Sequence, residues 1–523
     1  MVVFGAIMLC MFLTAIDQSI VATAIPKVLA DLNGFHIFSW VITAYLLAMT
    51  VTIPIIGKLS DMFGRRPFLL GGVGLFVAAS AACGAAPTMI VLIAARGVQG
   101  IGAGLIVSCV FATLGDLFTP LERAKYFAFF TGMFTFAQLA GPGFGGLLAD
   151  GPGWRWCFYI NLPLGLLAGA FIAMQLPKGG GAGGRISDID VRGAALLAVS
   201  TVSLMLAVVW ASPEWGWVSP QTIGLLATTL VVTVVFILNE RTHPQPIIPL
   251  GLFRNVPFVQ GVAMTFFAAS GVFAGAQLLP TYVQTSLGAS AAASGLVVTP
   301  QAFGGLVTSI IGGQIVSRTG RFKYQMILGT VLMGIAALLL TQLHANEAEW
   351  RIGLIMVLMG LGTGLVFPMT QVLVQGAVSQ HEQGVASSVR QFFNVIGQTL
   401  GTAALSLVLT TSYTSAFTST TPDLAQAMPA VYRDFQDPTL ALDPTRYAAA
   451  KEQVLVLPNG QALLDRARQA QREAVATAID HVFIGTVSLL TIVFAVAVSL
   501  REIRLRRSFE ADGDEPRTPH VEV

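Results

Sequence analysis

Residues 89–115 read MIVLIAARGVQGIGAGLIVSCVFATLG, an apolar run of 27 positions in which Arg96 is the only charged side chain. About 20 apolar residues are enough to cross a bilayer as a helix, whereas a barrel strand needs about ten residues of alternating character. The run is therefore predicted to be a transmembrane helix that carries one buried charge and a row of glycines.

The same pattern recurs along the chain. Of its 523 residues, 54% are hydrophobic and 11% are charged, whereas a soluble domain carries about 25% charged residues. This composition excludes a soluble globular protein, because only lipid allows apolar side chains on every face of a helix. We expect fourteen transmembrane helices. They lie near residues 2–24, 37–57, 68–86, 89–115, 124–148, 158–176, 191–210, 220–238, 256–284, 291–316, 324–343, 352–376, 387–412 and 481–500.

Neither the net charge nor the cysteines indicate a second class of function. The 29 basic and 27 acidic side chains give a net charge of +2, which does not favour nucleic-acid binding. The four cysteines, Cys10, Cys83, Cys109 and Cys157, lie in or beside apolar runs without paired spacing. We therefore expect no metal site and no disulfide framework.

The basic residues of the short loops predict the orientation, because cytoplasmic loops are enriched in Lys and Arg. One side collects Lys58, Arg65, Arg66, Arg123, Lys125, Lys178, Arg185, Arg192, Arg241, Arg254, Arg318, Arg321 and Lys323. The other side collects only Lys27, Arg155 and Arg351. The first side is predicted to face the cytoplasm, and an even number of spans places both termini there.

Two repeated sequence segments indicate that the two halves of the chain arose by duplication. The segment GKLSDMFGR at 57–65 returns as GQIVSRTGR at 313–321, and GIGAGL at 100–105 returns as GLGTGL at 360–365. The displacements are nearly equal, as expected of parallel repeats. The predicted organisation is a six-helix bundle at 1–177, a cytoplasmic Gly-rich linker at 178–190, two inserted helices at 191–238, a cytoplasmic linker at 239–255, a second six-helix bundle at 256–500 and a cytoplasmic tail at 501–523. The second bundle includes an extracytoplasmic loop at 413–479, either a cap or a gate, whose stretch 462–478 is predicted to be helical and to run into the last span.

Charges inside apolar spans are the candidates for transport chemistry, because a charge at the bilayer centre costs at least ~2.5–3.5 kcal/mol. Asp17 lies in the first span, where a carboxyl group lining a cavity can take up and release a proton. The alternative for Asp17 is a hydrogen bond that packs helices together. Arg96 either modulates the proton affinity of Asp17 or is satisfied by helix carbonyls.

The segment after the second span is a candidate conformational latch. Its glycines allow tight turns, and its acidic and basic side chains can pair at neighbouring helix ends. The candidate latch residues are Gly57, Asp61, Gly64, Arg65, Arg66 and Asp116. Such a cluster can hold one conformation and release in another, as alternating access requires. The alternative, a basic cytoplasmic anchor, explains the arginines but not the acidic residues.

The fifth span contains GPGFGG at 141–146, which combines a helix breaker with small residues that let helices approach closely. Gly141, Pro142, Gly145 and Gly146 are therefore predicted to form a bend or hinge.

Together these segments resemble the major facilitator superfamily, and within it the fourteen-helix drug:proton antiporter family of multidrug exporters. The resemblance covers nearly all membrane spans. Residues 15–26 look like the first-helix motif of that family, 57–68 like its loop motif A, 92–104 like its motif B and 141–146 like the core of its motif C. WRWCFYINLP at 154–163 is similar to a further signature of the family.

The resemblance implies an all-α fold of two six-helix bundles related by a parallel repeat, with two inserted helices. It also implies export driven by proton influx, with no cofactor. Asp17 would carry the proton with help from Arg96, and Asp61, Arg65 and Asp116 would form the latch. Ser317 replaces the acidic residue in the second copy of the loop, so the latch is expected in one half only.

The substrate cavity is expected between the halves, near the midplane. Its candidate lining residues are Gln18, Tyr45, Gln138, Gln277, Tyr282, Gln301, Gln371, Phe393 and Asn394. With Asp17 and Arg96 as the clear intramembrane charges, the cavity suits a neutral or cationic amphiphile better than a multiply charged anion.

The sequence therefore favours a monomeric, proton-coupled exporter of hydrophobic or cationic small molecules, such as drugs, in the cytoplasmic (inner) membrane. A dedicated exporter of a lipid, siderophore or other metabolite is the alternative. A membrane enzyme acting on lipid-linked substrates would show clustered acids, histidines or metal ligands at one face, whereas the six histidines are scattered. A channel would need repeated polar linings or charge rings.

Overall fold

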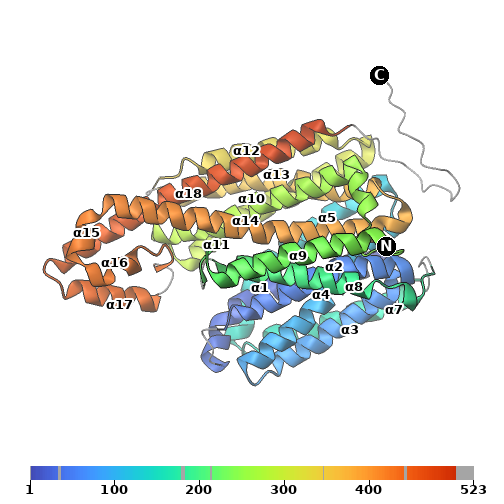
Figure 1. The fold of residues 1–523 in the computed structure, drawn as a ribbon, viewed down its shortest axis with the longest axis horizontal. Helices are drawn as coiled ribbons and strands as arrows, with labels where there is room; N and C mark the ends of the chain where they lie inside the picture. The colour runs from blue at the N-terminus through green and yellow to red at the C-terminus, as the bar shows by residue number, and fades with distance from the viewer. Residues whose placement is uncertain are drawn as a thin grey trace.

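The computed structural model describes residues 2–32, 37–177, 183–211, 215–344, 347–440 and 444–501. Residues 178–182 of the predicted Gly-rich linker at 178–190 and residues 502–523 of the predicted cytoplasmic tail lie outside these ranges. Helices dominate the described part of the chain, which contains no strand (Figure 1). The α-helices are α1 (Val2–Leu32), α2 (Trp40–Phe63), α3 (Arg65–Gly84), α4 (Met89–Leu117), α5 (Pro120–Asp150), α6 (Trp156–Tyr159), α7 (Asn161–Gln175), α8 (Val191–Trp210), α9 (Pro220–Thr242), α10 (Val256–Thr285), α11 (Ala291–Thr319), α12 (Lys323–Leu340), α13 (Glu349–Gly376), α14 (Gln383–Thr420), α15 (Pro422–Ala427), α16 (Pro429–Phe435), α17 (Pro444–Leu455) and α18 (Gly460–Ser499).

Thirteen of the described helices are long and apolar enough to cross a membrane, counting α6 and α7 as one. They coincide with thirteen of the fourteen predicted spans. The remaining prediction, at 124–148, falls on α5, a helix of 31 residues that packs against α1 and α11. The all-α fold with fourteen membrane helices that the sequence predicts therefore agrees with the structure.

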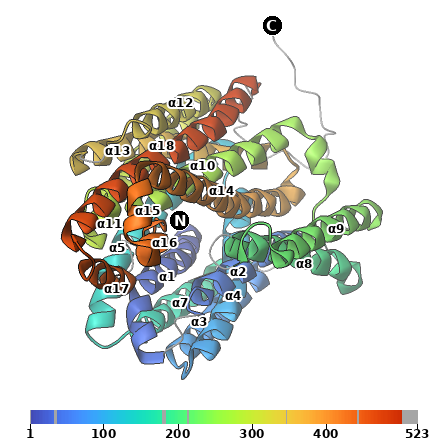
Figure 2. The same cartoon turned by 60° about the vertical axis from the view of Figure 1, so that its left-hand side comes forward.

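The helices form two bundles that lie side by side (Figures 1 and 2). The first contains α1 to α5 and α7, and the second contains α10 to α14 and α18. The halves meet where α2 and α4 pack against α14 and where α5 packs against α11. The inserted pair, α8 and α9, stands outside both bundles, where α8 touches α2 and α14. We call the end with the α2–α3 turn the latch end, and the opposite end, with α15 to α17, the cap end.

The duplicated glycines occupy equivalent positions in the two bundles. A Cβ on Gly100 of α4 would collide with Tyr45 of α2, and a Cβ on Gly360 of α13 would collide with Gln301 of α11. The same tight packing surrounds Gly102, Gly104, Gly362 and Gly364. Each stretch thus lets one central helix approach its two neighbours at backbone distance, which accounts for the echo in the sequence.

Two long helices extend to the cap end. α14 has 38 residues and α18 has 40, so each is roughly 60 Å long, about twice the thickness of the hydrocarbon core. The helix predicted at 462–478 is confirmed as part of α18, which continues into the last span. The hydroxyl of Tyr413 donates to the carbonyl of Phe435 over 2.7 Å and fixes α16 to α14. Although half-burial by itself raises the pKa of Asp437, hydrogen bonds from Thr439 and Arg446 hold that pKa below its ordinary value.

The GPGFGG stretch forms a contact face in this structure. α5 runs without interruption from Pro120 to Asp150, through Pro142. A Cβ on Gly141 would collide with Ser19 of α1, and one on Gly145 would collide with Thr23. Gly146 has no neighbour within 4 Å of such a Cβ. Two of the four predicted hinge residues therefore hold α5 against α1.

Gly141→Ala should destabilise the protein, because the added methyl group meets the Cβ of Ser19 and overpacking typically costs about 1–3 kcal/mol. Gly143→Ala is the matched control, since nothing lies within 4 Å of its Cβ position and alanine is the better helix former by about 1 kcal/mol. We expect thermal unfolding in detergent to shift down for Gly141→Ala and to stay unchanged or rise for Gly143→Ala. Equal unfolding temperatures for the two variants would contradict this packing.

Candidate functional site

Asp17 and Arg96 form a buried ion pair in the first bundle. Asp17 of α1 is 0% exposed and Arg96 of α4 is 1% exposed, and Arg96 Nη1 lies 2.6 Å from Asp17 Oδ2. The other carboxylate oxygen accepts hydrogen bonds from Gln99 Nε2 at 2.9 Å and from Asn161 Nδ2 at 2.8 Å. Both oxygens of the carboxylate are thus bonded, which is what an ion pair withdrawn from water requires.

The guanidinium of Arg96 also contacts residues other than Asp17. Its Nε donates to the carbonyl of Val41 over 3.1 Å, and its Nη1 also donates to Gln99 Oε1 over 2.6 Å. The ring of Tyr45 lies 4.2 Å from the guanidinium carbon, a distance typical of a cation–π contact. The sequence left open whether Arg96 pairs with Asp17 or is satisfied by a carbonyl, and in the structure it does both.

Sequence reasoning quoted Gln99 and Asn161 only as parts of longer motifs. Gln99 lies one helical turn after Arg96 on α4, and Asn161 is the first residue of α7. Both amides also reach Ser80 of α3, at 2.7 and 3.3 Å. The signal that could have singled them out is their polarity at positions that helical periodicity places beside a buried charge.

This arrangement could couple protonation of Asp17 to a conformational change. A proton on Asp17 would remove the charge that compensates Arg96 and leave the guanidinium buried without an anion. Breaking a buried pair by removing one partner costs about 3–5 kcal/mol. The protonated state therefore favours a conformation in which water or other polar groups reach Arg96.

The predicted latch residues meet at the latch end. Arg65 Nε lies 3.1 Å from Asp116 Oδ2, and the same guanidinium pairs with Asp61. Asp61 Oδ2 also accepts a hydrogen bond of 2.8 Å from the backbone amide of Val385, at the start of α14. The N-terminus of α14 carries a partial positive charge that favours this carboxylate. Asp61 therefore joins the two bundles.

The remaining latch candidates take different positions. Gly64 has a φ of +90° and makes the turn between α2 and α3. A Cβ on Gly57 would collide with Ser388, so this glycine brings α2 against α14. Arg66 does not join the cluster, because it donates to the carbonyl of Ala173 in α7. In the second copy of the loop, the hydroxyl of Ser317 donates to its own helix at Gln314.

The hydrogen bonds between the two bundles lie towards the latch end. Besides Asp61 and Val385, Ser108 pairs with Ser388 over 2.7 Å and Gln375 Nε2 donates to the carbonyl of Phe111 over 2.9 Å. The hydroxyl of Ser309 donates to the carbonyl of Ala128 over 3.2 Å. We call these four contacts the seam. The seam joins the two bundles at the latch end, so the molecule is closed there.

The predicted cavity residues do not share one surface. Tyr45 belongs to the Arg96 cluster, Gln18 follows Asp17 on α1, and Gln138 of α5 accepts a hydrogen bond from Ser19. In the second bundle, Tyr282 is fully buried and donates to the carbonyl of His344 over 2.6 Å.

The other five lie on α10, α11, α13 and α14. Gln277 is exposed, and Gln301 packs under Gly360. Phe393 contacts the rings of Phe253, Phe266 and Phe392. Asn394 is buried and accepts a hydrogen bond from Gln398. Gln371 is buried beside Arg390, a charged residue that sequence reasoning missed.

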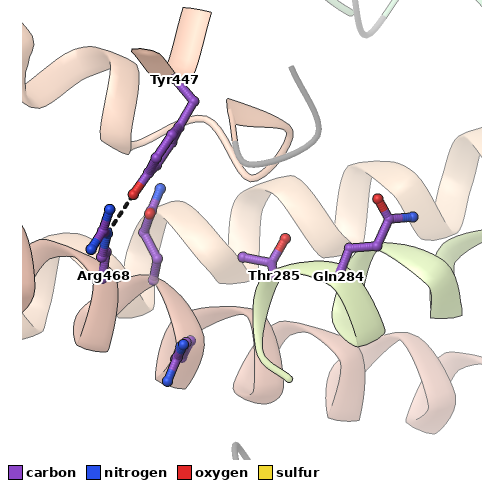
Figure 3. A pocket seen from close by; sticks show the side chains of 6 residues that line it. Gln284, Thr285, Tyr447 and Arg468 are labelled. Carbon is purple, nitrogen blue, oxygen red and sulfur yellow. Dashed lines mark hydrogen bonds between the residues drawn. The ribbon is translucent and has the colours of Figure 1, made fainter. Parts of the chain in front are cut away.

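A pocket of about 160 Å³ lies at the cap end, between the end of α10 and the helices α17 and α18 (Figure 3). It is lined by Gln284, Thr285, Tyr447, Arg468, Gln471 and Arg472. Arg468 donates to the hydroxyl of Tyr447 over 2.5 Å and closes one side of the pocket. Its volume is below the 300–1,000 Å³ of drug-sized sites, and none of the predicted cavity residues lines it.

The chain resembles known transporters over most of its length. The sequence profile of the Major Facilitator Superfamily matches residues 7–402. The chain is 40% identical over 403 residues to the multidrug transporter protein MdtP of Bacillus subtilis, covering 77% of the chain and 74% of that protein. It is 34% identical over 414 residues to multidrug resistance protein 3 of the same organism, covering 79% and 80% respectively.

A solved structure supports the fold. The crystal structure of the human organic anion transporter MFSD10 superposes with a TM-score of 0.60 at 15% identity, covering 94% of this chain and 99% of that one. At this identity the likeness concerns the fold alone.

Removing the guanidinium of Arg65 should open the latch end. In Arg65→Ala the carboxylates of Asp61 and Asp116 lose their shared cation, and the loss of charge-assisted hydrogen bonds costs about 1.5–3 kcal/mol. A cysteine placed at Ser108, with the four native cysteines replaced, should then react with a membrane-permeant maleimide roughly tenfold faster.

Arg66→Ala is the matched control for this experiment, because it removes the adjacent guanidinium without touching the carboxylates. Its maleimide reaction rate should equal that of the parent. The same rate in Arg65→Ala and the parent would show that Arg65 does not hold the seam closed.

Proposed function

Because the chain belongs to the major facilitator superfamily, we propose that it is a proton-coupled antiporter that exports hydrophobic or cationic small molecules by alternating access. Family membership makes it a transporter rather than an enzyme. The names of its two relatives, a multidrug transporter and a multidrug resistance protein, support drug-like compounds as substrates. The energy source in this proposal is the transmembrane proton gradient, and no cofactor takes part.

The buried pair of Asp17 and Arg96 is the observation that carries the proposal. It is the one ion pair in the described residues that is almost fully withdrawn from water inside a bundle. Its carboxylate accepts hydrogen bonds from three donors, the side chains of Arg96, Gln99 and Asn161, which satisfy both of its oxygens in this closed conformation. Proton uptake at this position disturbs five helices at once, because the network reaches α1, α2, α3, α4 and α7.

The cycle follows from the two clusters. We place the latch end in the cytoplasm, because the basic loop residues gather there, and both termini then lie in the cytoplasm. With the seam closed, Asp17 takes a proton from the outside as substrate leaves. Protonation weakens the ion pair between Asp17 and Arg96, and the latch then opens towards the cytoplasm. Asp17 releases its proton to the cytoplasm when new substrate binds.

The alternative substrate class is a dedicated lipid, siderophore or other metabolite. The same proton site would serve it, so substrate identity has to be measured. A panel of dyes, antiseptics and antibiotics applied to efflux-deficient cells separates the two, because a dedicated exporter protects against none of them.

Asp17→Asn should abolish coupled export, because the amide cannot carry a proton, while the helix contacts that need only a neutral acceptor survive. The test uses a compound against which the parent protein protects cells. When this compound is added to inverted membrane vesicles that hold an imposed pH gradient, the parent protein should release protons from them. The Asp17→Asn protein should give the signal of empty membranes, and cells that express it should be as sensitive as those carrying the empty vector.

Asp150→Asn is the matched control, since this acidic residue forms an exposed ion pair with Lys27 at the end of α5. Both variants are compared at matched membrane expression, and Asp17→Asn should unfold at the lower temperature, because it removes the charge that compensates the buried Arg96. Substrate-driven proton release that persists in Asp17→Asn would refute the proposed coupling.

A further inference from the structure

Arg390 of α14 is a buried cation in the second bundle. It is 5% exposed. Its Nε donates to Gln371 Oε1, and its Nη1 lies 3.4 Å from the hydroxyls of Thr265 and Thr370. These partners are 0–1% exposed and all of them are neutral. The guanidinium is therefore enclosed by α10, α13 and α14 without a compensating charge from them.

Nowhere in the described ranges does an acidic side chain form an ion pair with Arg390. Arg96, which is as deeply buried, has Asp17 at 2.6 Å. Arg123, also buried, donates to the carbonyls of Gly115 and Phe118 at the C-terminus of α4, where the helix end carries partial negative charge. Arg390 has neither kind of compensation, so it retains the desolvation cost that a missing anion would offset.

The contacts that Arg390 does make leave capacity for a ligand. Two of its hydrogen bonds, at 3.4 Å, are longer than the usual 2.7–3.2 Å. A guanidinium carries five N–H donors in a planar fork, and this fork matches the two oxygens of a carboxylate. The hydroxyls of Thr265 and Thr370 donate to carbonyls of their own helices in this conformation, and by turning each could donate to the same group instead.

Arg390 also lies where the two bundles face each other. Two residues before it, Ser388 makes the seam contact with Ser108. Its guanidinium carbon is 6.0 Å from the ring of Phe111 in α4 of the first bundle. Gln371, its own partner, donates to Ser387, which also binds Gln375 of the seam. Opening the seam would move the first bundle away from Arg390, so that Arg390 becomes accessible from the path between the two halves.

We propose that Arg390, with Thr265, Thr370 and Gln371, binds the anionic group of a substrate, so that this exporter also takes amphiphiles carrying a single carboxylate. The inference rests on the proposed function and extends its substrate class from neutral and cationic compounds to lipophilic weak acids. A monoanion bound here neutralises the uncompensated guanidinium, while the apolar part of the molecule lies against side chains such as Phe111.

The experiment uses the full chain reconstituted in phosphatidylcholine vesicles, so that no anionic headgroup competes for the site. Two fluorescent probes of similar size, a lipophilic carboxylate and a lipophilic cation, are followed under the same pH gradient. In Arg390→Gln, carboxylate transport should fall at least tenfold, equivalent to about 1.4 kcal/mol, while cation transport stays within twofold. Arg390→Lys, which keeps the charge but not the fork, should retain part of the carboxylate transport.

Arg468→Gln is the matched control, because it removes a guanidinium from the cap pocket of the same half. Its transport of both probes should equal that of the parent. A purely structural role for Arg390 predicts equal losses for both probes together with a lower unfolding temperature, and that result would overturn the inference.

Equilibrium dialysis of the carboxylate probe against the detergent-solubilised protein tests the site without transport. The parent should bind the probe and Arg390→Gln should not. If the parent moves the cation but neither binds nor moves the carboxylate, this inference fails and the proposed function stands. If the Asp17→Asn protein still transports both probes under the pH gradient, the proposed proton coupling is refuted. The anion site is supported independently if Arg390→Gln lowers transport of the carboxylate probe alone.

Discussion

A hydrocarbon interior supplies no water to a charge, and this constraint shapes the structure around Asp17 and Arg96. The pair is stable because its oxygens and nitrogens are bonded within the first bundle by Gln99, Asn161 and the carbonyl of Val41. Each of these contacts comes from a different helix or a different turn. The bundle is therefore organised around one polar cluster, and a change of charge there acts on the packing of five helices at once.

The cluster around Asp17 and Arg96 and the latch share two helices, α2 and α4. α4 carries Arg96 towards the cap end and Asp116 at the latch end, and α2 carries Tyr45 and Asp61 in the corresponding places. Glycines hold α4 so close to α2 that the two backbones touch. Packed interfaces of this kind do not deform gradually. A shift of α4 caused by proton uptake would therefore reach the seam as a movement of the whole helix.

The sequence predicted the spans, because runs of about 20 apolar residues in a chain with so few charges indicate membrane helices. It singled out Asp17 and Arg96 because both lie far inside such runs, but it left open whether they pair. It missed Arg390, which lies four positions into a predicted span that begins at 387 and so looks like a residue of the membrane surface. The cavity residues that the sequence suggested do not share one surface in the structure. Hydropathy shows how deep Tyr282 or Gln277 lies but not which way each faces, and the structure turns Tyr282 towards His344.

The two halves share their glycines but not their charges. The close approach of α4 to its neighbours is repeated by α13, because backbone contact is what a duplicated bundle must keep in order to fold. The polar positions are free of that requirement and have diverged. The first bundle holds an acid and a base that neutralise each other, together with the acidic latch residues. The second holds Arg390 with neutral partners, and Ser317 where the latch has its acid. In the proposed cycle, such a division would assign proton exchange to one half and leave the other half free to adapt to the substrate, because a change in the second bundle would not disturb the carboxylate of Asp17.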